Sequence, residues 1–160
     1  MRKAQRTAVM AILLGGVLAL GSVTVGAQKS AQRWTTAETV MPDALVKELK
    51  NPDRTARPVV VCAGFQVLYR GAHVPGAAFA GPPSRPQGLA ALKAWAAPLP
   101  RTTNLVVYCG CCPMTKCPNI RPAFAALHAM GFTRLRVLVL PRSFAKDWVY
   151  RHLPIARGTM

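Results

Sequence analysis

Most cysteines of this chain lie in one short segment. Cys109, Cys111, Cys112 and Cys117 fall between positions 109 and 117, and only Cys62 lies outside this segment. Thiolates are nucleophiles and ligands for soft metals, so the clustering indicates a local chemical site rather than a distributed disulfide framework. An odd number of cysteines also leaves at least one thiol unpaired within the monomer.

The neighbours of Cys109 predict where its sulfur lies. The segment 105–108 is apolar and rich in β-branched residues, which predicts a buried strand, and a helix is expected over 121–130. In open parallel α/β sheets, reactive groups gather beyond the carboxyl ends of strands, where loop N–H groups and the start of a helix favour an anion. We therefore expect Cys109 to be a largely ionised nucleophile, with Lys116 and Arg121 as local cations.

The rest of the chain alternates between segments with the pattern of strands and segments with the pattern of helices. Further strands are expected over 59–61 and 135–140, and further helices over 41–50, 88–97 and 143–152. The strands are apolar on both faces, which is typical of a parallel sheet covered by helices on both sides. We predict one α/β domain with a central parallel sheet.

The N-terminal segment has the pattern of an export signal. A basic start is followed by an uncharged segment, 7–27, that ends in Val25-Gly26-Ala27, with the small residues that signal peptidase accepts. An uncleaved membrane anchor is the alternative. We expect cleavage between Ala27 and Gln28, a periplasmic or secreted protein, and no stable membrane insertion afterwards. The predicted segments are a signal peptide over 1–27, a linker over 28–35 and the domain over 36–157.

The chain is strongly basic. It has 21 Lys and Arg against 5 Asp and Glu, a formal net charge of +16. The basic residues are scattered rather than gathered in a run, so we interpret them as a general field that attracts anions. Export excludes nucleic acid as the expected partner. The expected partners are a small anionic sulfur donor and a thiol acceptor, and the domain is expected to be a monomer.

Two segments together resemble rhodanese-like domains. Tyr108-Cys109, a loop, Arg121 and a helix that closes in Met130-Gly131-Phe132 are similar to that family's active-site segment. His73-Val74-Pro75-Gly76-Ala77 resembles the segment that follows its first strand. The segments 43–49 and 144–148 also resemble its opening and late helices, so the resemblance covers roughly 36–154.

The resemblance implies a sulfurtransferase that carries sulfane sulfur as a persulfide on Cys109. Sulfur would pass from thiosulfate or a related donor to a thiol or cyanide. By the same resemblance Arg121 is an anion-binding and structural residue, and His73 is mainly structural. The candidate substrate-binding residues are Gly110, Cys111, Cys112, Lys116 and Arg121, and no cofactor and no metal are expected.

Two departures from the family pattern bear on the substrate. Cys62-Ala63-Gly64 stands where the family usually has Asp-x-Arg. Arg121 also lies much further from Cys109 than the family's arginine lies from its cysteine, because the loop is longer and carries three additional cysteines. Loop dimensions determine which oxyanion fits, so the natural donor stays open. The cysteine, five residues, arginine pattern of phosphatase-like relatives is absent, since Thr115 occupies the position of their cysteine.

The additional cysteines have three interpretations. Cys112 and Cys117 are the first candidates for a disulfide or a redox relay to Cys109. Cys111, Cys112 and Cys117 would otherwise bind a metal together with Cys109, and Cu(I) would suit such a set, although the spacing lacks the paired C-x2-C of ordinary zinc sites. The alternative functions are therefore a thiol-disulfide redox protein and a thiolate metal-binding module. Cys62 follows three valines and is expected to be packed.

Overall fold

A computed structural model of the protein describes residues 33–158. Within these residues five strands form one sheet in the order β1-β5-β4-β2-β3, and every pairing is parallel. The strands are β1 (Thr39–Val40), β2 (Val59–Cys62), β3 (Ala78–Phe79), β4 (Leu105–Tyr108) and β5 (Leu135–Leu138). The predicted signal peptide and the first part of the linker lie outside the described residues.

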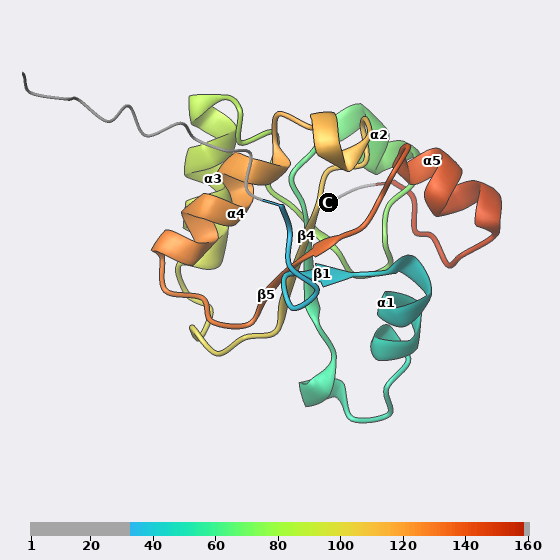
Figure 1. Ribbon diagram of the computed structural model, residues 1–160, viewed down its shortest axis with the longest axis horizontal. Coiled ribbons are helices and arrows are strands. Elements are labelled where there is room, and N and C mark those ends of the chain that lie inside the picture. Colours follow the sequence, from blue (N-terminus) through green and yellow to red (C-terminus); the bar gives the residue numbers. More distant parts are fainter. Residues whose placement is uncertain (1–32, 159–160) are drawn as a thin grey trace, which may run out of the picture. The chain divides into compact units, whose positions relative to one another are not determined.

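Helices cover both faces of this sheet (Figure 1). They are α1 (Pro42–Leu49), α2 (Gln66–Gly71), α3 (Pro86–Ala96), α4 (Ile120–Ala129) and α5 (Phe144–Asp147). Side chains from α3 and α4 pack on one face, and side chains from α1, α2 and α5 on the other. The predicted α/β class with a parallel sheet between two helical layers is confirmed.

Strand β4 divides its side chains between the two cores. Leu105 and Val107 enter the core beneath α3 and α4, whereas Val106 and Tyr108 enter the core beneath α1, α2 and α5. This follows from the alternation of side chains along a strand. Cys109, the next residue, continues the alternation and belongs to the α3 and α4 core.

The expected elements are present with small changes at their ends. The expected strand over 135–140 ends at Leu138, and the expected helix over 143–152 is two pieces, α5 and the 3-10 turn η3 (Val149–Arg151). Trp148 separates them because its backbone (φ −129°, ψ −64°) departs from helical values while its side chain is fully buried. Strands β1 and β3 and helix α2 were not predicted. Among the described residues, no helix has the length and apolar content needed to cross a membrane.

Candidate functional site

The candidate site is the loop that connects β4 to α4. Cys109 directly follows β4, and the loop then passes through the 3-10 turn η2 (Met114–Lys116) before α4 begins. The Cys109 and Cys111 sulfurs are 3.2 Å apart, and those of Cys111 and Cys112 are 3.1 Å apart. The Cys117 sulfur also lies within 4.8 Å of the Cys109 and Cys111 sulfurs. The loop thus gathers all four of its cysteines at the carboxyl end of β4, as the sequence predicted.

Gly110 makes the turn that brings Cys111 back toward Cys109. Its φ is +81°, a value that L side chains rarely adopt, and a Cβ there would lie 2.6 Å from the Cβ of Phe144. The Gly110 carbonyl oxygen also accepts a hydrogen bond from the Phe144 N–H at 3.1 Å. Backbone conformation and the close approach of α5 therefore both require glycine here.

Asn119 is a site residue that the sequence analysis missed. Its side chain is fully buried, and its Nδ2 donates a hydrogen bond to the Cys109 sulfur at 3.3 Å. Its Oδ1 accepts from the Ser84 N–H at 3.3 Å, which fixes the orientation of the amide. Asn119 occupies the N-cap position of α4 but makes no side-chain capping bond. The one available signal was an asparagine just before a helix, which capping would have explained equally well.

The surroundings of the cluster shift the pKa values of Cys117 and Cys109 in opposite directions. The Cys109 thiol donates a hydrogen bond to Cys117, and the backbone N–H groups of Asn119 and Ile120 also donate to it; together these lower the pKa of Cys117 to about 5. The same bond to Cys117, together with burial, raises the pKa of Cys109. An ionised Cys109 in the working enzyme stays a prediction. The N–H groups at the start of α4 reach Cys117, the cysteine nearest to them in sequence, so their effect on pKa falls mainly on that thiol.

The five cysteines are free thiols in this structure. The candidate disulfide between Cys112 and Cys117 is not present in this structure, and its formation under oxidising conditions stays a prediction. Partial burial and the neighbouring Cys111 raise the pKa of Cys112 to about 12. Cys62 is packed as expected: its sulfur lies 3.9 Å from the Cys109 carbonyl oxygen, and burial raises its pKa to about 11.

The two predicted cations are exposed residues of η2 and of the first turn of α4. Lys116 is exposed on η2. Arg121 is exposed in the first turn of α4, and its guanidinium lies over the Trp34 ring at 4.1 Å, with Glu38 in its electrostatic environment. This contact directs the guanidinium to the N-terminal end of the described chain. A role for either residue in binding an anion stays a prediction.

His73 has the structural role that was expected. Its Nδ1 lies 2.7 Å from the Tyr69 carbonyl oxygen, and its ring stacks on that of Tyr69 at 3.9 Å between centroids. Its backbone N–H and carbonyl oxygen pair with Ala156 near the end of the described chain. His73 thus joins the segment after α2 to the C-terminal segment.

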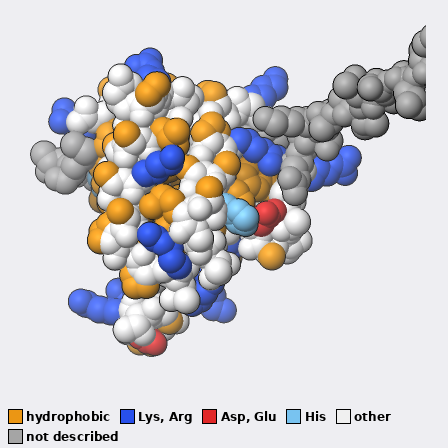
Figure 2. Space-filling model, turned by 90° about the vertical axis from the view of Figure 1, so that its left-hand side faces the viewer, with side chains coloured by type: hydrophobic (Ala, Val, Ile, Leu, Met, Phe, Trp, Pro, Cys, Tyr) orange, Lys and Arg blue, Asp and Glu red, His pale blue; other side chains and the backbone are white. Residues whose placement is uncertain are grey.

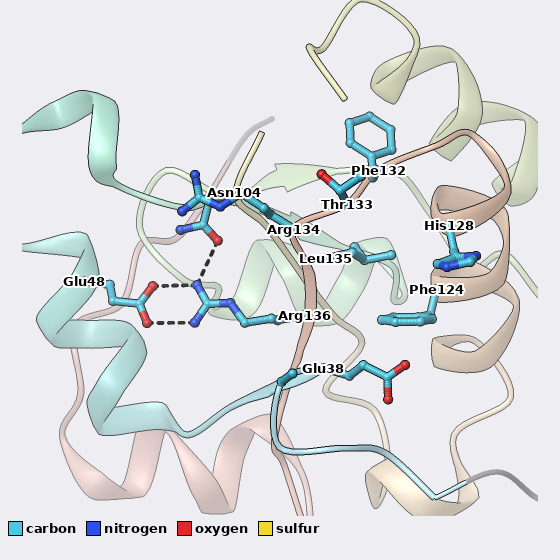
Figure 3. Close-up of a pocket in the computed structure, with 11 residues that line it drawn as sticks. Glu38, Glu48, Asn104, Phe124, His128, Phe132, Thr133, Arg134, Leu135 and Arg136 are labelled. Carbon is cyan, nitrogen blue, oxygen red and sulfur yellow. Dashed lines mark hydrogen bonds and ion pairs between the residues drawn. The ribbon is translucent and has the colours of Figure 1, made fainter. Parts of the chain in front are cut away.

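Two cavities are relevant to the site. One of about 330 Å³ is mainly apolar and is lined by Cys109 and Gly110 together with Tyr108 and Phe144. A larger one, of about 610 Å³, is shown in Figure 3 and lies at the other end of β4, where Asn104 precedes the strand. Its lining includes Arg136 and Glu48, which form an ion pair at 2.6 Å, and no cysteine lines it. The larger cavity is therefore separate from the cysteines of the β4–α4 loop.

Among the described residues, the group of side chains that could together hold a metal ion is Cys109, Cys111 and Cys117. Cys109 and Cys117 are buried and Cys111 is half-buried. Two of the three residues are thus shielded from solvent, and the third is partly accessible to it. Sulfur ligands select soft ions. The cluster thus supports both nucleophilic sulfur chemistry and soft-metal binding.

No family model and no curated protein matches the chain, but solved structures do. The Alr3790 protein of Anabaena sp. superposes with a TM-score of 0.56 at 14% identity, over 76% of this chain and 94% of that one. The rhodanese-like domain from Alr3790 gives 0.54 at 17% identity, over 75% and 79%. Thiosulfate sulfurtransferase from Pseudomonas aeruginosa gives 0.53 at 23% identity, over 79% of this chain and 20% of that one. The chain has the rhodanese-like fold. The resemblance stated from the sequence is thereby confirmed for the fold.

Within this rhodanese-like fold, the segment Cys62-Ala63-Gly64 has a physical explanation. A Cβ on Gly64 would lie 2.6 Å from the carbonyl oxygen of Cys109. The Ala63 N–H donates to the Tyr108 carbonyl oxygen at 2.7 Å, so the ends of β2 and β4 continue their pairing up to the site. The chain after β2 therefore supports the backbone of Cys109 at close range, where a larger residue would not fit.

Proposed function

We propose that this protein is a sulfurtransferase that carries sulfane sulfur as a persulfide on Cys109. The observation that carries the proposal is the placement of the Cys109 sulfur beyond the carboxyl end of β4, with the Asn119 amide at 3.3 Å and the Cys111 sulfur at 3.2 Å. The rhodanese-like fold supports it, and one structure of that fold is a thiosulfate sulfurtransferase. We propose thiosulfate or a chemically similar anion as the donor and a thiol or cyanide as the acceptor.

The reaction divides into two displacements at sulfur. Cys109 loses its proton to the Cys117 thiolate and attacks the outer sulfur of thiosulfate; a new S–S bond forms, the old one breaks, and sulfite leaves with the electron pair. The acceptor thiolate then attacks the outer sulfur of the persulfide and returns Cys109 to the thiolate. The Asn119 N–H, which points at the Cys109 sulfur, stabilises the negative charge in both steps.

We propose that the donor approaches through the cysteine loop. Cys109 is only 4% exposed, whereas Cys111 and Cys112 are half-buried. The loop segment that carries Gly110, Cys111 and Cys112 is thus the part of the site that meets a substrate first. On this ground we propose that these three residues bind the substrate.

Intact-mass measurement after anaerobic incubation with thiosulfate tests the proposal. We expect a gain of one sulfur atom that a thiol acceptor removes, that Cys109→Ser abolishes and that Cys62→Ala retains. The control is matched, because Cys62 is an equally buried thiol at the end of the neighbouring strand. A gain that survives Cys109→Ser would refute the role of Cys109. A loss of two hydrogens that a reductant restores would identify a thiol-disulfide redox protein instead.

We also propose that the protein is exported, with cleavage between Ala27 and Gln28. The uncharged segment that follows the basic N-terminus and the small residues before Gln28 support this. Expression of the full chain in a bacterium with a periplasm, followed by fractionation and mass measurement, should give a mature protein that begins at Gln28. Full-length protein retained in the membrane would refute cleavage.

A further inference from the structure

The sulfurs of Cys109, Cys111 and Cys117 are spaced as ligands of a single ion. All three lie within 4.8 Å of one another, and the pair Cys109–Cys111 is at 3.2 Å. A metal–sulfur bond of about 2.3 Å places the corners of a trigonal sulfur set about 4 Å apart. The sulfurs would therefore move by less than about 1 Å to coordinate an ion at their centre.

We infer that this loop binds one Cu(I) ion through the sulfurs of Cys109, Cys111 and Cys117. The inference does not depend on the proposed sulfur transfer, because it rests on the spacing of the sulfurs alone. Three thiolates and no nitrogen or oxygen ligand form a soft donor set, which suits Cu(I) as well as Zn²⁺. Zn²⁺ in a closed structural site would require a fourth ligand, and Cys112 lies outside the group of mutually close sulfurs.

The surroundings of the cluster provide hydrogen-bond donors for such a complex. The Asn119 Nδ2 donates to the Cys109 sulfur, and the backbone N–H groups of Asn119 and Ile120 donate to Cys117. Three thiolates around Cu(I) carry a net charge of −2, which these donors and the basic surface of the protein partly compensate. The thiol protons leave to solvent on binding, and the copper keeps its oxidation state.

The position of the site also predicts competition between copper binding and sulfur loading. Cys109 is both a ligand of the inferred ion and, in the proposed function, the residue that carries the persulfide. An ion bound there occupies the lone pairs needed for attack on a sulfur donor. If the proposed function holds, Cu(I) blocks sulfur loading, and a persulfide on Cys109 weakens copper binding by the same linkage.

Anaerobic titration of the reduced protein with Cu(I), against a chromogenic Cu(I) chelator, tests the inference. We expect one equivalent of tightly bound copper and three sulfur neighbours by X-ray absorption. Cys111→Ser should weaken binding by more than about a hundredfold, since losing a ligand exceeds the 10- to 100-fold loss typical of outer-shell changes. Cys111 is half-buried, so this variant should keep its fold, which circular dichroism can verify.

The matched controls are Cys62→Ala and Cys112→Ser, both of which should retain binding within a few-fold. The inference would be overturned if Cys111→Ser bound copper as tightly as the unmodified chain. It would also be overturned if Cys112→Ser lost binding as fully as Cys111→Ser, because the ion would then have four sulfur ligands. Copper binding without sulfur loading would reject the proposed function and leave this inference intact. Sulfur loading without copper binding would reject this inference and leave the proposed function intact.

Discussion

At the residue scale, Asn119 offers the sharpest test of how the site treats charge on sulfur. Its Nδ2 donates to the Cys109 sulfur. A hydrogen bond to a charged group contributes about 1.5–3 kcal/mol, so Asn119→Ala should slow the thiosulfate-dependent mass gain by about tenfold or more. The control is Asn104→Ala, which removes a hydrogen bond to Arg136 at 2.9 Å, at the opposite end of β4. Equal slowing in both variants would mean that only general stability had been lost.

Gly110 provides a second residue-scale prediction, this time on stability. Gly110→Ala adds a strained φ of +81° and a contact of 2.6 Å with Phe144, so we expect a loss of about 2–3 kcal/mol in the free energy of unfolding. Gly76→Ala shares the strain (φ +75°) but meets nothing within 4 Å, so it should lose only about 1 kcal/mol. Denaturant unfolding measures both. Equal losses would show that α5 moves aside without cost.

The sequence predicted the place of the cysteine sulfurs but not the contacts that shift their pKa values. An apolar strand that ends at Cys109 was enough to locate the thiol at the edge of the sheet. The pKa of each thiol depends on which sulfur the N–H groups of Asn119 and Ile120 reach. That is a property of the path of the loop, and no spacing rule for cysteines contains it. The inward direction of the Asn119 amide was hidden for the same reason.

At the element scale, the long apolar segments could be predicted from the sequence, whereas the short elements could not. Strands β2 and β4 and helices α1, α3 and α4 carry strong periodic patterns. Strand β1 has two residues and exists because Thr39 and Val40 pair with Val137 and Leu138 of β5. Strand β3 likewise depends on its partner β2. Such elements are formed by tertiary pairing, which local sequence does not encode.

The stability that the ion pair between α1 and β5 contributes should depend on pH. The bidentate hydrogen bond from Arg136 holds the pKa of Glu48 below its ordinary value of 4.5. A lowered folded-state pKa adds stability above pH 4.5, and this contribution is lost as the pH falls through the lowered value. Glu48→Gln should therefore be less stable than the unmodified chain at pH 7, and the difference should shrink below pH 4.5. Denaturant unfolding across this range measures it. A constant difference would contradict the assignment.

At the scale of the whole molecule, the excess of basic residues should steer anionic donors. Figure 2 shows Lys and Arg side chains scattered among apolar side chains over the face that lies on the left in Figure 1. The proposed mature protein, 28–160, has 18 Lys and Arg against 5 Asp and Glu, a formal net charge of +13. The rate of sulfur loading from thiosulfate should therefore fall several-fold between low and physiological ionic strength. Loading from an uncharged trisulfide is the control and should not change. Equal salt dependence for both donors would exclude electrostatic steering.

The alternation along β4 makes the position of the sulfur depend on strand register. Tyr108 and Cys109 enter opposite cores, so their side chains exchange surroundings if the strand shifts by one residue. An insertion of one residue ahead of β4 that changed its register would place the thiol among aromatic rings, away from the amide and the helix start. Engineered chains that lengthen this segment should therefore add residues in pairs.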